Sequence, residues 1–210
     1  MFDIDGTLVE SYDIDAQCFI DAVQEVMGLS INSNWADYEH VTDEGILNEV
    51  LSNHGISNRD AVKAEIKRRF IQKLEVELAQ EPVREIKGAA SFLHRLQSME
   101  NVVVSLATGG WRESATLKLR SANIDYLSIP MASSDDHYSR TEIMKLAASR
   151  AAKDQYACTY FGDGIWDQAA SAQLGFNFVL VGDKLNHHQN IMDFQSIDTA
   201  LAYAGLSSAR

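Results

Sequence analysis

The sequence has few cysteines and no long hydrophobic run, and each shortage excludes a class of protein. Its two cysteines, Cys18 and Cys158, lie far apart in apolar stretches, so we expect buried free thiols in a reducing compartment rather than a disulfide framework. No segment approaches the ~18–20 consecutive apolar residues of a membrane span, and no signal peptide precedes Asp3. We therefore expect a cytoplasmic protein with no membrane partner.

Basic residues are also scarce. The 210 residues include 18 Lys and Arg against 30 Asp and Glu, a formal net charge of −12. The one short basic run, at 67–69, lies inside a helical pattern. Because a phosphate polymer requires a basic footprint, we expect no nucleic-acid partner. An acidic protein with an anionic substrate needs a cation in its site, and a bound metal would supply one.

Apolar runs alternate with helical patterns over most of the chain, and 46% of the residues are hydrophobic. The sequence predicts buried strands at Val102–Ala107, Ala157–Phe161 and Phe176–Val181, and a weaker one at Asp125–Pro130. It predicts helices at Ala89–Ser98, Arg112–Ser121, Thr141–Lys153 and Asp167–Leu174. This order is typical of an α/β fold, a Rossmann-like open parallel sheet flanked by helices.

Residues 12–84 have a different pattern, with helical periodicity and no good buried strand. The periodic stretches are Ala16–Val26, Asp43–His54 and Asp60–Glu77. We predict an inserted helical cap domain over 12–84 and a core domain formed by 1–11 and 85–210. The hinges would lie at Val9–Asp13 and Val83–Gly88.

The first predicted strand is short. Only Met1 and Phe2 precede Asp3, whereas a buried strand typically has ~5–6 residues. Either the natural chain starts earlier, or this strand is stubby; the sequence alone does not decide between them.

Two aspartates, Asp3 and Asp5, come at the end of this first apolar segment. Side chains of a strand alternate between faces, so residues two apart point the same way. Two carboxylates on one side repel unless a divalent metal or a shared proton stabilises them. Gly6 and Thr7 allow a sharp turn and offer backbone N–H groups and a hydroxyl to an anion. Taken alone, the same residues also fit an acidic turn.

A second acidic pair, Asp163 and Asp167, follows a predicted strand and opens a helix. Taken alone, either carboxylate fits a helix cap. Open α/β sheets bind ligands outside the carboxyl ends of their strands, however. There the pair would join Asp3 and Asp5 around a hard, oxygen-ligated cation such as Mg²⁺.

Two further groups follow the predicted strands. Thr108 supplies a hydroxyl, and the Gly109 and Gly110 backbone N–H groups are free to approach an anion. The residues Ser139-Arg140-Thr141-Glu142 match a capping box, S-x-x-E, which opens the next helix. This arrangement places Arg140 at the edge of the same crevice, where it would neutralise a phosphoryl group and orient a nucleophile.

Together these motifs resemble the haloacid dehalogenase superfamily over nearly the whole chain. The D-x-D-G-T motif matches residues 3–7, the Ser/Thr that ends the second strand matches Thr108, and the G-D-x-x-x-D motif matches 162–167. The helical insert is similar to a C1-type cap, as in phosphoglycolate phosphatase-like members.

The resemblance implies a role for each matching residue. Asp3 would be the nucleophile that forms an aspartyl-phosphate, and Asp5 the general acid and then base. The resemblance implies Mg²⁺ held by Asp3, the backbone carbonyl of Asp5, and Asp163, with Asp167 a ligand through water or an orienting group. Thr7 and Thr108 would position and bind the phosphoryl group.

The chain departs from the family at its third motif, which usually has Lys. Arg140 stands at the aligned position, and Lys145 lies about one turn further along. Arginine keeps the charge but is a planar fork, so the exchange is not neutral. Substrate-binding candidates in the cap are His40 and Thr42, with Asp43 beside them; an N-cap role is favoured for Thr42.

The prediction is a magnesium-dependent phosphomonoesterase that acts on a small soluble phosphate ester. A sugar-phosphate mutase, or a catalytically weak binding or regulatory protein of the same fold, remains an alternative. The oligomeric state and the identity of the ester are not encoded in any motif.

Overall fold

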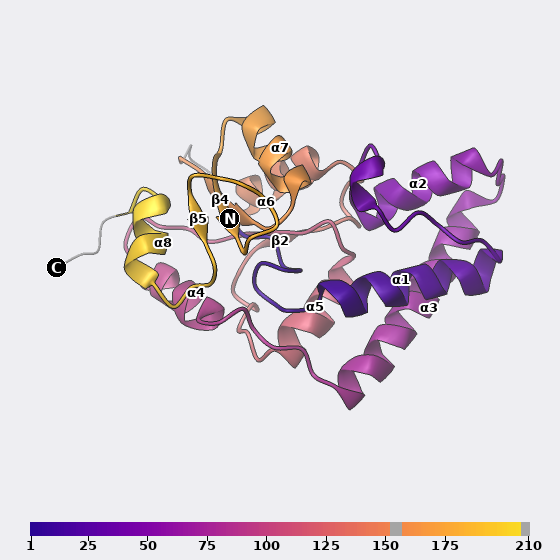
Figure 1. The fold of residues 1–210 in the computed structure, drawn as a ribbon, viewed down its shortest axis with the longest axis horizontal. Helices are drawn as coiled ribbons and strands as arrows, with labels where there is room; N and C mark the ends of the chain where they lie inside the picture. The colour runs from indigo at the N-terminus through magenta and orange to yellow at the C-terminus, as the bar shows by residue number, and fades with distance from the viewer. Residues whose placement is uncertain (152–156, 207–210) are drawn as a thin grey trace.

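The computed structural model describes residues 1–151 and 157–206, and its helices fall into two groups (Figure 1). Three helices follow the first segment: α1 (Tyr12–Met27), α2 (Asp43–Asn53) and α3 (Arg59–Gln80). A short 3₁₀ turn, η1 (Trp35–Asp37), lies between α1 and α2. The remaining helices alternate with strands: α4 (Ala89–Gln97), α5 (Arg112–Ser121), α6 (Arg140–Ala151), α7 (Ile165–Leu174) and α8 (Ile197–Tyr203).

The strands are short and all pair in parallel. They are β1 (Leu106–Ala107), β2 (Met131–Ala132), β3 (Thr159–Gly162), β4 (Asn177–Val181) and β5 (Asn190–Ile191). β1 pairs with β2, and β4 lies between β3 and β5. Phe2 bridges Leu106 on one side and Phe161 on the other. The first segment therefore joins the two strand groups at the middle of the sheet.

Alternate residues of these strands are buried on opposite faces of the sheet. Phe2, Leu106, Phe161 and Val179 belong to a hydrophobic cluster with residues of α4, α5 and α8. Their neighbours Met1, Ala107, Tyr160 and Phe178 belong to another cluster with residues of α6 and α7. The result is a sheet between two helical layers, which confirms the predicted α/β class.

The helices of 12–80 have a hydrophobic cluster of their own. It combines Phe19 of α1, Leu47 of α2 and Phe70 of α3 with Trp111, which precedes α5. In Figure 1 these helices extend to the side of the sheet-containing part. We call them the helical cap. Trp111 is fully buried at the contact between the helical cap and the core.

Several predicted boundaries are wrong. Only the last two residues of the predicted strand Val102–Ala107 form a strand. The first segment of the chain lies beside them in the sheet and has only Met1 and Phe2 to pair with them. Asp125–Pro130 forms turns, and the strand β2 begins just after it. Its apolar residues Tyr126 and Ile129 are buried in the core without a ladder. The strand β5, at Asn190–Ile191, is not among the predicted strands. Residues 152–153 of the helix predicted at 141–153 lie outside the described residues.

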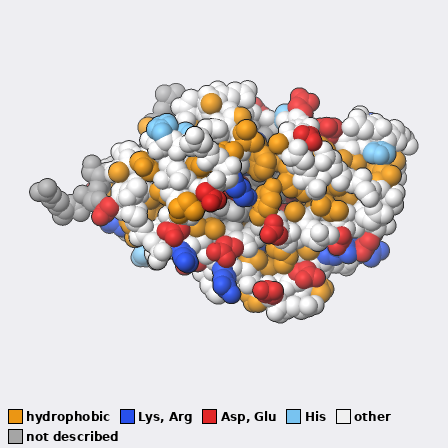
Figure 2. Space-filling view, in the orientation of Figure 1, with side chains coloured by type: hydrophobic (Ala, Val, Ile, Leu, Met, Phe, Trp, Pro, Cys, Tyr) orange, Lys and Arg blue, Asp and Glu red, His pale blue; other side chains and the backbone are white. Residues whose placement is uncertain are grey.

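None of the helices in the described part of the chain combines the length and apolar character that a membrane span requires. On the face drawn in Figure 2, Lys and Arg side chains are scattered among Asp and Glu rather than gathered in one basic patch.

The aromatic centre of the core supplies a stability prediction. Phe2 stacks on Phe161 with ring centroids 4.7 Å apart, and Phe92 and Phe194 pack against the same ring. Replacing Phe2 by Ala should lower the free energy of unfolding by about 3–5 kcal/mol, because it empties a fully enclosed site. Urea denaturation measures the change. Leu127→Ala is the control, since Leu127 is 81% exposed and should change stability by less than about 0.5 kcal/mol.

Candidate active site

Side chains that lie far apart in the sequence line one cavity at the carboxyl edge of the sheet. Asp3 and Asp5 follow the first segment, Thr108 follows β1, and Asp163 follows β3. Arg140, the first residue of α6, lines the same cavity, whose volume is about 90 Å³. The parallel strands produce this convergence because their carboxyl ends lie together.

Three carboxylates form the centre of the site. One oxygen from each of Asp3, Asp163 and Asp167 lies within 4.8 Å of the others, and all three residues are buried. Burial, followed by the Asp167 charge, raises the pKa of Asp3 well above its ordinary value. Burial and the Asp167 charge also raise the pKa of Asp163, to about 6. The cluster therefore needs cations to remain ionised.

Arg140 is one of these cations. Its Nη1 lies 2.7 Å from Oδ1 of Asp167 and 3.5 Å from Oδ1 of Asp3. Burial alone would lower the pKa of Arg140, but Asp167 and the nearby Tyr160 and Asp3 raise it above its ordinary value. Lys145 is 54% exposed and pairs with Glu142 at 2.7 Å, away from the cluster. Of the two candidates for the cation of the third motif, Arg140 therefore lies at the carboxylate cluster and Lys145 does not.

The predicted capping box at the start of α6 does not form. The Ser139 hydroxyl contacts Thr141 Oγ1 at 2.9 Å, and the Ser139 N–H donates to His137 Nδ1. Glu142 accepts from Lys145 instead of reaching back to Ser139. Arg140 is held by its own guanidinium contacts, which include a 3.0 Å hydrogen bond to the Val41 carbonyl of the cap.

The carboxylate cluster fits a hard divalent cation. Its donors are all carboxylate oxygens, the ligands that Mg²⁺ prefers, and their mutual separation allows them to share one ion. Lys184 Nζ donates to Asp163 Oδ2 at 2.6 Å, so this lysine is the cation nearest that carboxylate. Sequence reasoning missed Lys184, which lies in the loop after β4 where no motif marks it.

The turn after Asp5 brings the two acidic loops together. Gly6 has φ of +74°, and a Cβ there would lie 2.2 Å from Asp163 Oδ2, so only glycine allows this approach. We expected the Gly6 and Thr7 N–H groups to be available to an anion, and this prediction is wrong. They donate to the Val9 and Ile4 carbonyls within the turn. Thr7 is fully buried, and its hydroxyl has no partner among the described residues.

The Thr108 loop approaches both Arg140 and the cap. Gly109 lines the cavity, and a Cβ on it would lie 2.4 Å from Arg140 Nη2. Its carbonyl accepts a 2.8 Å hydrogen bond from the Asp43 N–H. Gly110 differs from the prediction of a free amide, since its N–H donates to Thr108 Oγ1 at 3.0 Å.

Asp5 is held by a lysine that sequence reasoning missed. Lys118 of α5 is fully buried, and its Nζ lies 2.6 Å from Asp5 and 2.5 Å from Asp15 of α1. Ser11 donates a 2.5 Å hydrogen bond to Oδ1 of Asp5. Burial would lower the pKa of Lys118, but Asp15 and Asp5 raise it above its ordinary value.

The cap candidates lie in different surroundings. Thr42 lines the cavity and also caps α2, accepting from the Gly45 N–H at 3.0 Å and donating to the Tyr138 carbonyl. His40 stands outside the cavity, near Glu39 and against the Tyr138 ring. The structure thus brings Thr42, but not His40, to the other site residues.

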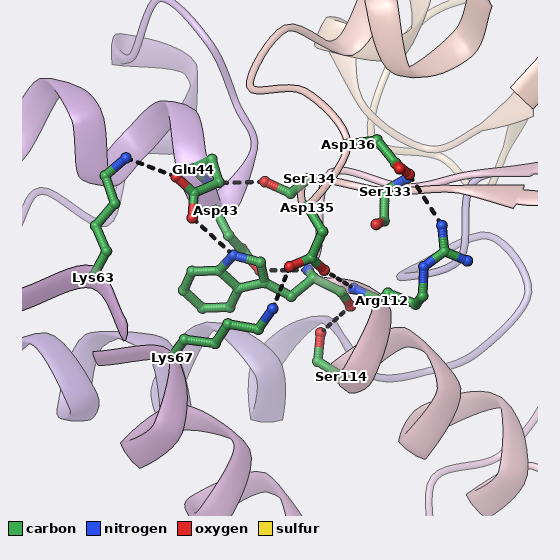
Figure 3. Close-up of polar contacts among 11 residues, drawn as sticks. Asp43, Glu44, Lys63, Lys67, Arg112, Ser114, Ser133, Ser134, Asp135 and Asp136 are labelled. Atoms are coloured by element: carbon green, nitrogen blue, oxygen red, sulfur yellow. Dashed lines mark hydrogen bonds and ion pairs between the residues drawn. The ribbon is translucent and has the colours of Figure 1, made fainter. Parts of the chain in front are cut away.

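Polar contacts fix the cap against the core beside the cavity (Figure 3). The Trp111 N–H donates to Asp43 at 2.8 Å, and its indole N–H donates to Glu44 at 3.2 Å. The Glu44 N–H donates to Ser134 Oγ at 2.9 Å. Lys67 of α3 pairs with Asp135 of the core. These contacts place Asp43 in the cavity wall.

The sequence matches the profile of the haloacid dehalogenase-like hydrolases over residues 1–181, and the chain belongs to this family. No curated protein matches the sequence. Among solved structures, a hydrolase from Pseudomonas syringae is 22% identical with a TM-score of 0.71, and the match covers 89% of this chain and 85% of that one. The fold is thus that of a family of hydrolases.

Two further structures show the same fold at lower identity. A putative phosphoglycolate phosphatase from Lactobacillus plantarum is 16% identical with a TM-score of 0.65, over 94% of this chain and 95% of that one. The putative hydrolase YfnB from Bacillus subtilis, described as bound to magnesium, is 14% identical with a TM-score of 0.60, over 96% of each chain.

The carboxylate cluster predicts pH-dependent magnesium binding. A carboxyl group must be ionised to bind a cation, and the pKa of Asp163 is raised to about 6. Affinity for Mg²⁺ should therefore fall as the pH falls, by about tenfold per unit or more once the pH is below the pKa of Asp163. Calorimetric titration between about pH 5 and about pH 8 measures the change. Asp163→Asn should weaken binding at every pH, whereas Asp60→Asn on the exposed start of α3 should not; equal affinity across the range would contradict the assignment.

Proposed function

We propose that the protein is a magnesium-dependent phosphomonoesterase that hydrolyses a small phosphate ester through an aspartyl-phosphate. The observation that carries this proposal is the arrangement around Asp3. Its carboxylate lies in a cavity with a buried guanidinium 3.5 Å away and two further carboxylates within reach of a shared cation. A nucleophilic carboxylate beside cationic groups is what phosphoryl transfer requires.

Asp3 and Asp5 divide the chemistry. An Asp3 oxygen attacks phosphorus, and the bond from phosphorus to the ester oxygen breaks as Asp5 gives a proton to that oxygen. Asp5 then takes a proton from a water that attacks the phosphorus of the aspartyl-phosphate. This second step releases phosphate and regenerates the Asp3 carboxylate, so both residues return to their starting states.

Asp3, Asp163 and the backbone carbonyl of Asp5 would hold the Mg²⁺ ion, with Asp167 ligating through water or orienting the site. When bound, the ion neutralises the carboxylates and polarises the phosphoryl oxygens. Arg140 positions Asp3 and Asp167 and adds a second positive charge. Thr108 and Gly109 face the cavity where phosphoryl oxygens would lie.

The remaining contacts support proton transfer. Lys118 contacts both oxygens of the Asp5 carboxylate and Ser11 donates to Oδ1, and together they fix its orientation. We assign residues 12–84 to a C1-type cap domain and 1–11 with 85–210 to the core domain. In support, the cap helices share a hydrophobic cluster, and cap residues line the cavity beside the core aspartates. Closure of the cap would exclude water from the aspartyl-phosphate.

The position of Arg140 argues against the alternative of a weakly catalytic binding protein. The support for that alternative was the replacement of the usual Lys by Arg. The guanidinium reaches both Asp3 and Asp167, so the positive charge is where the nucleophile needs it. This geometry favours the enzyme.

Asp3→Asn should abolish phosphate release, because an amide is not a nucleophile at this position. The assay is p-nitrophenyl phosphate hydrolysis with Mg²⁺, and the loss expected is at least about 10³-fold in kcat. Asp60→Asn makes the same chemical change on the exposed surface of the cap and should leave the rate unchanged. Residual activity of Asp3→Asn within about tenfold of the parent would contradict the proposal.

A further inference from the structure

Core residues and cap residues with different chemistry line the cavity. Asp3, Asp163 and Arg140 belong to the core part, which we call the phosphoryl end because the phosphoryl group would bind there. The cap residues form what we call the cap end, which must enclose the part of the ester that departs with the oxygen. Its walls are the carboxylates of Asp15 and Asp43 and the apolar side chains of Phe19, Trp35 and Ile46. The inference below concerns this cap end and rests on the proposed function.

No cation faces the cap end. Among the described residues that line it, none is Lys, Arg or His. Arg140 is engaged at the phosphoryl end, where its Nη1 lies 2.7 Å from Asp167. A carboxylate or second phosphate on the leaving group would therefore meet carboxylates without a compensating positive charge.

The two lysines near the cavity are already engaged. Lys118 is fully buried, lies outside the cavity lining, and contacts Asp5 and Asp15 together. Lys184 pairs with Asp163 at the phosphoryl end, and its Nζ stands 3.6 Å from the centre of the Tyr12 ring. To reach an anionic leaving group, either lysine would have to break its ion pair with a buried carboxylate. Breaking a buried ion pair is energetically costly because it leaves the carboxylate unpaired.

The cap end has an excess of acidic groups. Lys118 supplies one positive charge to two carboxylates, Asp5 and Asp15. Asp43 accepts from the backbone N–H of Trp111, which is a neutral donor (Figure 3). Burial and the neighbouring Asp15 charge raise the pKa of Asp43 well above its ordinary value. A positive charge on the ligand would relieve this repulsion.

We propose that the leaving group of the substrate carries a cationic nitrogen, such as a primary ammonium, and no carboxylate or second phosphate. The ammonium donates to Asp15 and Asp43, and the Phe19 and Trp35 rings supply an apolar, polarisable wall that also suits a cation. A neutral leaving group is tolerated less well, and an anionic one is disfavoured by like-charge repulsion.

Three esters with a two-carbon skeleton test the proposal, because their leaving groups are similar in size and differ in charge. They are 2-aminoethyl phosphate, 2-hydroxyethyl phosphate and 2-phosphoglycolate, each assayed with Mg²⁺ by phosphate release. The expected order of kcat/KM is ammonium, then neutral, then carboxylate, with at least about tenfold between the first and the last. p-Nitrophenyl phosphate serves as the charge-neutral reference substrate.

Asp43→Asn provides a matched variant, since an amide oxygen still accepts the Trp111 N–H. The ratio of kcat/KM for the ammonium ester to that for the neutral ester should fall by about tenfold. Glu39→Gln makes the same charge change in the cap at a side chain that is 85% exposed, and it should keep the ratio of the parent. Thermal melting of both variants shows whether each is folded, and the substrate series on the parent protein stands without them.

The outcomes separate the two proposals. Equal or greater kcat/KM for 2-phosphoglycolate overturns the inference and leaves the proposed function intact. Turnover of p-nitrophenyl phosphate with none of the two-carbon esters overturns it as well. No phosphate release from any of the four, with magnesium bound, overturns the proposed function itself.

Discussion

The structure depends on holding several carboxylates together away from water. Asp3 and the pair Asp163 and Asp167 come from two separate parts of the chain and lie buried within reach of one another. Like charges in a low-dielectric site repel strongly, so the arrangement persists only with cations among them. Arg140 and Lys184 supply two fixed charges. The requirement for more positive charge is what makes the site suited to a divalent metal and to phosphoryl transfer.

A second charged network connects this centre to the cap. Lys118 belongs to the core helix α5 and contacts both Asp5, just after the first segment, and Asp15 of the cap helix α1. Trp111 adds backbone and indole contacts to Asp43 and Glu44 of α2. The same set of interactions therefore fixes both the position of the cap and the orientation of the Asp5 side chain. The wall that selects the leaving group is built from the same residues.

Sequence reasoning reached the fold class and the principal aspartates because both have local signatures. Strand and helix alternation is periodic, and residues such as Asp3 and Asp163 follow apolar runs at characteristic spacing. Strand lengths were less accessible: residues 102–104 have strand composition but no neighbouring strand to pair with. Pairing is a long-range property, which composition does not record.

Lys118 shows where a signal existed but was missed. The buried face of α5 includes Ser114, Ala115 and Leu119, and Lys118 falls within that stripe. A lysine on the apolar face of a short helix needs a buried partner, which points to a functional or structural ion pair. Its partners, Asp5 and Asp15, are over 100 positions away, so only the folded chain identifies them. Lys184, in a polar loop, had no comparable signature.

Covalent phosphorylation of Asp3 is the central claim, and trapping the acyl phosphate tests it most directly. The protein is mixed with excess phosphate ester and Mg²⁺, quenched during turnover, and reduced with borohydride, which converts an aspartyl-phosphate to homoserine. Mass spectrometry of the N-terminal peptide should find homoserine at position 3 and aspartate at position 5. Steady turnover with an unaltered residue 3, or with homoserine at another aspartate, would contradict the account.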